Sequence, residues 1–114
     1  HMYFNKWLTE QLEQLPISRA DLSRLSGVSY STMNGAKKFD PRISNLVLIC
    51  EVLTESKMLR QYPEYKDYPE LPQWRKESLK EKAAALLDST IISAIASCGV
   101  EYSFAINRLQ EREK

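Results

Sequence analysis

The sequence predicts an all-α fold, and three runs of apolar residues carry this prediction. In each run the apolar side chains recur every three or four residues, the spacing that places them on one face of a helix. The runs lie at residues 4–15, 43–53 and 79–95. The chain has 114 residues, of which 43% are apolar and 27% charged, enough for one compact domain or a domain with a small helical appendage.

The first two helices are defined by their ends. Residues 3–15 carry the first apolar stripe, and Pro16 ends that helix because proline has no backbone N–H and its ring clashes with the preceding turn. Ser18 and Asp21 are spaced as an approximate capping box, in which a hydroxyl and a carboxylate each accept a backbone N–H. A second helix is therefore expected to begin at about Arg19.

A short third helix is expected after a tight turn. Gly27 tolerates the positive φ of such a turn, so the second helix ends just before it. Ser29 then caps a helix over residues 30–37, in which only Met33 and Ala36 are candidates for the buried side. The outward face of this helix is therefore polar and rich in hydrogen-bonding groups.

The fourth helix has the strongest start signal. Asp40 is an N-cap acceptor, and Pro41 suits the first helical position. One face carries Ile43, Leu46, Val47, Cys50 and Leu53, and a second carries Leu48, Ile49 and Val52. Two apolar faces predict burial on two sides, against the first three helices and against a further element, for which the C-terminal half is the candidate.

The second half of the chain is expected to begin with a connector. Residues 62–73 are rich in tyrosine and proline, which disfavours a continuous helix. Helical spacing resumes at Gln73, with candidate interruptions at Asp88-Ser89 and Gly99, and a last helix is expected near residues 104–109. The predicted organisation is an N-terminal helical domain over 3–56, a Tyr/Pro-rich connector over 57–73 and a helical dimerisation or partner-binding region over 74–114.

The composition argues against most enzyme classes. The opening His1-Met2 resembles a cloning-site remnant, so the native chain is expected to contain no histidine and hence no imidazole base or ligand. Cys50 and Cys98 lie too far apart for a paired thiolate ligand set and are interpreted as core thiols. We therefore expect a protein that is not an enzyme, with no metal and no cofactor. No apolar run approaches a membrane span, so we expect a cytoplasmic protein without a membrane partner.

One motif indicates function. Residues 18–34 combine a capped helix, a glycine turn and a second helix with a small, polar outward face, which are the parts of a helix-turn-helix. Residues 19–42 also concentrate positive charge, with five cations against two carboxylates and a net charge of +3. The whole chain, in contrast, has a formal net charge of +1.

The N-terminal half resembles the phage-repressor and Cro-type (XRE-like) helix-turn-helix family over residues 3–54. In that family a leucine of the first motif helix, the turn glycine and the apolar residue after it hold the two helices together. Leu22, Gly27 and Val28 occupy these positions. The resemblance implies an N-terminal helix-turn-helix bundle of four helices that binds double-stranded DNA.

The resemblance also assigns two groups of residues by position. The candidate base contacts in the major groove are Ser29, Tyr30, Ser31, Asn34 and Gly35. The candidate phosphate contacts are Ser18, Arg19, Lys37, Lys38 and Arg42. An asparagine amide can pair with adenine in two hydrogen bonds, whereas no arginine is placed to read guanine.

These expectations describe a sequence-specific transcriptional regulator, most often a repressor in this family, that binds a pseudo-palindromic operator as a homodimer. The alanines at 83–85 and the isoleucines at 91, 92 and 95 suit dimerisation through the C-terminal helices.

Three alternatives stay open at this point. One is an antitoxin-like autoregulator whose C-terminal helices bind a partner protein, and another is an adaptor that uses the fold without DNA. The third concerns residues 89–112, which form either a helical hairpin or a second helix-turn-helix. The second possibility arises because residues 99–103 are similar in sequence to residues 27–31.

Overall fold

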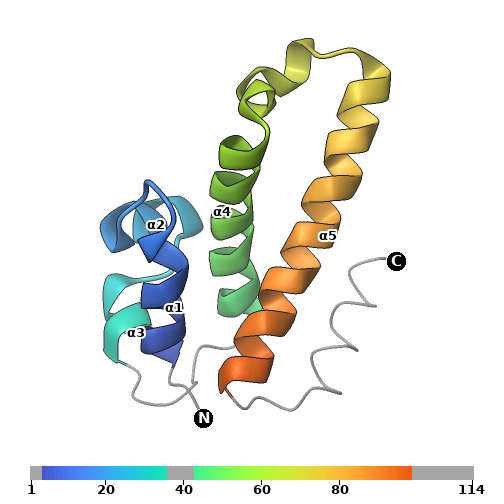
Figure 1. The fold of residues 1–114 in the computed structure, drawn as a ribbon. Coiled ribbons are helices and arrows are strands. Elements are labelled where there is room, and N and C mark those ends of the chain that lie inside the picture. Colours follow the sequence, from blue (N-terminus) through green and yellow to red (C-terminus); the bar gives the residue numbers. More distant parts are fainter. Residues whose placement is uncertain (1–3, 36–42, 99–114) are drawn as a thin grey trace.

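The computed structural model describes residues 4–35 and 43–98, and it confirms the all-α fold for them. The described chain forms six helices and no strand (Figure 1). These helices are α1 (Phe4–Glu13), α2 (Arg19–Ser26), α3 (Tyr30–Gly35), α4 (Ile43–Gln61), the 3₁₀ helix η1 (Pro63–Glu70) and α5 (Gln73–Cys98). The first three begin and end within a few residues of the positions that the sequence predicts.

Helix α4 is the centre of the molecule. It contacts α2 on one side and α5 on the other, and η1 folds back against it. Figure 1 shows α4 and α5 as a long antiparallel hairpin, with α1, α2 and α3 grouped beside α4. The predicted burial of this helix is confirmed for Leu46, Ile49 and Leu53, which are fully buried. It is wrong for Leu48 of the second predicted face, which is 42% exposed because it points away from the core.

A single hydrophobic core joins the two halves of the chain. Phe4, Trp7 and Leu8 of α1 belong to the same buried cluster as Ile91 and Ile95 of α5. The Trp7 indole N–H also donates to the Ser93 hydroxyl at 3.2 Å. Helix α5 therefore belongs to the same packed body as the N-terminal helices.

Two local expectations are corrected. Helix α4 continues to Gln61, so the first five residues of the predicted 57–73 connector are helical. The next residues, Pro63–Glu70, form a 3₁₀ segment kinked at Asp67, in line with the expectation that no continuous helix runs through 62–73. Helix α5 passes through Asp88-Ser89 without a break. It does so because Ile91 and Ile95, one turn later, are buried against the N-terminal helices, and tertiary packing outweighs weak local propensity.

The same burial corrects the assignment of these isoleucines to a dimer surface, because Ile91 and Ile95 are each about 1% exposed within one chain. Cys50 and Cys98 are buried thiols, as expected. The Asp40-Pro41 helix start, the helix near 104–109 and the second half of the 89–112 motif lie outside the described residues. No helix among those described combines the length and apolar character that crossing a membrane requires.

Candidate nucleic-acid interface

The start of α2 is fixed by the capping box that the sequence predicts. The Ser18 hydroxyl accepts the Asp21 backbone N–H at 3.1 Å, and the Ser18 backbone N–H donates to the Asp21 carboxylate at 3.1 Å. The hydrogen bond from the Ser18 backbone N–H is the largest cause of a lowered pKa for the Asp21 carboxyl, and the Ser18 side chain lowers it further. Ser18 therefore has a structural role, and its hydroxyl lies at the exposed end of α2.

The turn between α2 and α3 is centred on Gly27 and is held by hydrogen bonds from α2. Gly27 adopts φ 77°, in the left-handed region, and its N–H donates to the Ser23 carbonyl at 3.0 Å. The Ser23 hydroxyl donates to the Val28 carbonyl at 2.7 Å, and the Ser26 hydroxyl accepts the Val28 N–H at 3.1 Å. Side chains from the last turn of α2 thus fix the backbone that leads into α3.

Helix α3 has one buried and one exposed side. Met33 is fully buried, as is Leu22 of α2, whereas Ser29, Tyr30 and Ser31 are exposed. Tyr30 leaves 52% of its surface exposed. The tyrosine ring can stack on a planar group, and the hydroxyls can donate and accept hydrogen bonds, so this face is suited to a polar partner with planar groups.

The hydroxyls at the start of α3 are preorganised. The Ser29 hydroxyl accepts the Thr32 N–H at 3.2 Å and lies 2.6 Å from the Thr32 hydroxyl and 3.2 Å from that of Ser31. The side chains of three neighbouring exposed residues are therefore held together before any ligand binds. Three predicted base contacts, Ser29, Tyr30 and Ser31, occupy this one surface.

Arg19 is attached to α1. Its guanidinium donates to the Asn5 carbonyl at 2.9 Å and to the Thr9 hydroxyl at 2.6 Å. Burial lowers the pKa of Arg19, and the neighbouring Tyr30 phenol acts in the opposite direction. Two predicted site residues, Arg19 from the start of α2 and Tyr30 from the start of α3, are thus brought within electrostatic reach of each other.

The other predicted contacts are described only in part. Asn34 and Gly35 form the last turn of α3, and their side-chain surroundings are not described. Lys37, Lys38 and Arg42 lie outside the described residues. Two further residues near the turn, Ser23 and Arg24, were not among the predicted contacts. Ser23 is four residues before the turn glycine, a spacing that favours a bond across the turn, and Arg24 is an exposed cation that pairs with Asp21 at 3.5 Å.

The comparisons with known proteins give no relative. No family model, no curated protein and no solved structure matches the chain. The described residues also contain no cluster of three or more histidine, cysteine, aspartate or glutamate side chains that could hold a metal ion.

Proposed function

We propose that the protein is a sequence-specific DNA-binding transcriptional regulator, a repressor, that places α3 in the major groove of double-stranded DNA. The observation that carries this proposal is the two-sided α3. Leu22, Val28 and Met33 hold the helix in place from beneath, while Ser29, Tyr30 and Ser31 face outward with their hydroxyls exposed. A helix held in this way presents polar side chains to base edges without a cost for exposing apolar surface.

The proposed contacts divide into two kinds. Ser29, Tyr30, Ser31, Asn34 and Gly35 contact bases, and Ser18, Arg19, Lys37, Lys38 and Arg42 contact phosphates. Hydroxyls accept and donate to either base edge, so strong direct readout rests on the amide of Asn34. Much of the affinity then comes from phosphate contacts, and much of the specificity from the sequence-dependent shape of the DNA.

We further propose that the regulator acts as a homodimer through its C-terminal helices and binds a pseudo-palindromic operator. A dimer presents its two recognition helices about 34 Å apart, one turn of B-DNA, and the operator repeats the protein's two-fold symmetry. Because Ile91 and Ile95 are buried inside the chain, the proposed dimer surface is the outer side of α5, where Ala85 is exposed. Ala84 instead lines a hollow between α5 and α4.

The experiment that tests the proposal is selection of random duplex DNA by the purified chain, followed by sequencing of the bound pool. The expected result is an enriched inverted repeat whose half-sites are about 10 base pairs apart or a multiple of that. The double variant Tyr30→Ala/Ser31→Ala is expected to lose this enrichment, since it removes two of the exposed groups on α3.

The matched control is Lys66→Ala/Asp67→Ala on η1. It replaces two exposed residues and leaves the net charge unchanged. This control is expected to select the same repeat as the wild type. A folded wild type that enriches no sequence would overturn the proposal, as would a Tyr30→Ala/Ser31→Ala variant that selects the unaltered repeat.

A further inference from the structure

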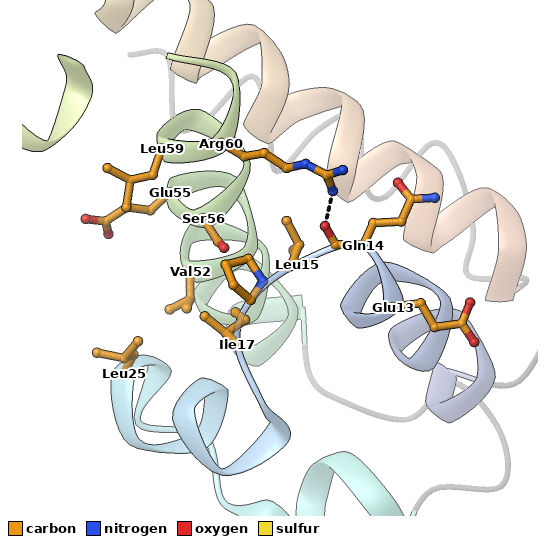
Figure 2. Close-up of a pocket in the computed structure, with 11 residues that line it drawn as sticks. Glu13, Gln14, Leu15, Ile17, Leu25, Val52, Glu55, Ser56, Leu59 and Arg60 are labelled. Atoms are coloured by element: carbon orange, nitrogen blue, oxygen red, sulfur yellow. Dashed lines mark hydrogen bonds between the residues drawn. The ribbon is translucent and has the colours of Figure 1, made fainter. Parts of the chain in front are cut away.

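A groove on the side of α4 is not used by the proposed DNA contacts. It lies between the turn that joins α1 to α2, the last turn of α2 and the C-terminal half of α4, and its volume is about 730 Å³. Figure 2 shows Leu15 and Ile17 at its floor and Leu25 and Leu59 at its edges. We call this surface the α2/α4 groove.

The groove exposes apolar side chains that residues 4–35 and 43–98 leave uncovered. Leu25 is 54% exposed and Leu59 39% exposed, and both line the groove. Ile17 and Val52 beneath them are half-buried. Large apolar side chains that protrude at the edges of a hollow are typical of a surface that a partner covers, because each would gain free energy on burial.

The side chains that line the groove carry two carboxylates and one guanidinium, a net charge of −1. Glu55 projects from α4 next to Leu59, whereas Glu13, at the end of α1, points away from the leucines (Figure 2). Arg60 donates to the Gln14 backbone carbonyl, a neutral acceptor, and keeps its positive charge. Three helices also end around it, α1 at Glu13, α2 at Ser26 and α4 at Gln61, and helix C-termini carry partial negative charge.

From this combination we propose that the α2/α4 groove binds an amphipathic helix of a partner protein, with apolar side chains on one face flanked by lysine or arginine. The leucines of the groove accept the apolar face, and Glu55 and the helix ends attract the cations. The α4 side of the groove runs from Val52 to Leu59, about 10 Å along a helix axis, which matches two turns of a bound helix.

Two other occupants are disfavoured by the same surface. A peptide that binds by adding a β-strand needs a strand edge to pair its backbone, and the described part of the chain has no strand. A second copy of the chain that offered this same groove would set two surfaces of the same net negative charge against each other, and like charges across an interface are unfavourable.

The test uses two synthetic, alanine-based helical peptides of about 18 residues, long enough to be helical alone. Both carry leucines spaced three and four apart on one face. One has lysine at the flanking positions and the other has glutamate. Fluorescence anisotropy with the full chain is expected to show binding of the lysine peptide, and at least about tenfold weaker binding of the glutamate peptide, because its charges are repelled. Added salt is expected to narrow this difference.

Matched variants of the protein locate the binding surface. Leu59→Lys is expected to weaken binding of the lysine peptide about tenfold or more, because it removes a buried leucine contact and adds a repelling charge. Leu48→Lys is the control, since Leu48 is 42% exposed on the same helix but does not line the groove. Glu55→Lys is likewise expected to weaken binding, while Glu51→Lys, one turn away and outside the groove, is not.

Circular dichroism of each variant establishes that it is folded. Failure of the wild type to bind the lysine peptide would overturn the proposal, as would equal binding of the two peptides. Undiminished binding by folded Leu59→Lys would do the same. The inference does not depend on DNA recognition, because no residue of α3 lines the groove, so Leu59→Lys is expected to select DNA as the wild type does.

Discussion

Lys57 shows how a single side chain joins three helices. Its ammonium, on α4, donates to the Gln11 side-chain carbonyl of α1 at 2.8 Å and to the Thr90 hydroxyl of α5 at 3.1 Å. Both acceptors are neutral, and the position is half-buried. Burial is the main cause of a lowered pKa for Lys57.

This lowered pKa predicts a change of stability with pH. In the unfolded chain Lys57 has its ordinary pKa of 10.5, whereas in the folded chain the pKa is lower, so binding of the proton opposes folding. The contribution of Lys57 to the free energy of unfolding therefore increases as pH rises through the folded pKa towards 10.5, and then levels off. Lys57→Met is expected to lack this increase.

The measurement is urea unfolding of the wild type and Lys57→Met at pH 7 and near pH 10. The stability of the wild type relative to the variant is expected to be larger at the higher pH. Lys80→Met, at an exposed position of α5, controls for the loss of one positive charge. An unchanged difference between wild type and Lys57→Met at the two pH values would show that burial does not act on this ammonium.

At the residue scale, local interactions could be predicted and long-range ones could not. The capping box of Ser18 and Asp21 and the turn at Gly27 involve residues a few positions apart, so the local sequence is enough to predict them. The partners of Lys57 and of Trp7 are separated by up to 86 positions. Only the packing of the helices determines such pairs.

At the scale of the element, the helix-turn-helix depends on one backbone angle. Gly27 has φ 77°, and a Cβ built at this position meets no atom within 4 Å. Replacing Gly27 therefore costs free energy through the backbone conformation and not through a steric clash. A substitution at this position measures the cost of the left-handed backbone alone.

Gly27→Ala is expected to reduce the free energy of unfolding by about 1–2 kcal/mol, the cost of the left-handed conformation for an L-residue with a Cβ. Gly27→Asn is expected to cost less, because asparagine adopts this conformation more readily. Urea unfolding of the two variants measures the difference. Equal stability of wild type and Gly27→Ala, or a larger loss in Gly27→Asn, would contradict the assignment of strain to this turn.

The presence of amphipathic helices could be predicted from the sequence more easily than the points at which they continue or end. The stripes that define α1 and α4 appear directly in the sequence because each buries only part of its circumference. The unbroken course of α5 through Asp88-Ser89 was not apparent, since these residues favour helix ends. The Ser89 and Thr90 hydroxyls donate to the Leu86 carbonyl, at 3.0 Å and 2.8 Å, and so bond within the helix rather than interrupting it.

At the scale of the whole molecule, the hairpin of α4 and α5 and the helix-turn-helix form one packed unit. The core cluster contains residues of α1, α2, α4 and α5. The prediction from sequence placed these residues in two separate regions, one for DNA binding and one for dimerisation. Apolar spacing shows that a helix face is buried, but it does not show which element buries that face. Ile91 and Ile95 were accordingly assigned to a second copy, although α1 and α4 of the same chain bury them.

This shared core predicts that damage to α5 affects the N-terminal half of the chain. Ile95→Ala, at a side chain about 1% exposed, is expected to cost about 2–5 kcal/mol. Near-ultraviolet and far-ultraviolet circular dichroism are expected to give one coincident unfolding transition. The matched control Ile92→Ala, at a half-buried position, is expected to cost less. Two separate transitions, with the N-terminal helices unaffected by Ile95→Ala, would refute a common core.

The charge distribution of the whole molecule gives the last prediction, which concerns the proposed DNA binding. The net charge of the chain is +1, so general attraction to DNA is weak, and affinity depends on the local cations of the motif. With about three basic side chains on phosphates in each protomer, a dimer releases enough counterions for a slope of about −5 in log affinity against log salt concentration.

Lys37→Ala removes one such contact from each protomer and is expected to reduce the magnitude of the slope by about 2, while the selected sequence stays the same. Lys66→Ala on η1 removes the same charge far from the motif in sequence and is expected to leave the slope unchanged. Fluorescence anisotropy over a series of salt concentrations measures both. The slope differs between Lys37→Ala and Lys66→Ala only if Lys37 releases counterions by contacting a phosphate. An affinity independent of salt, or equal slopes for wild type and Lys37→Ala, would therefore mean that these cations do not contact phosphates.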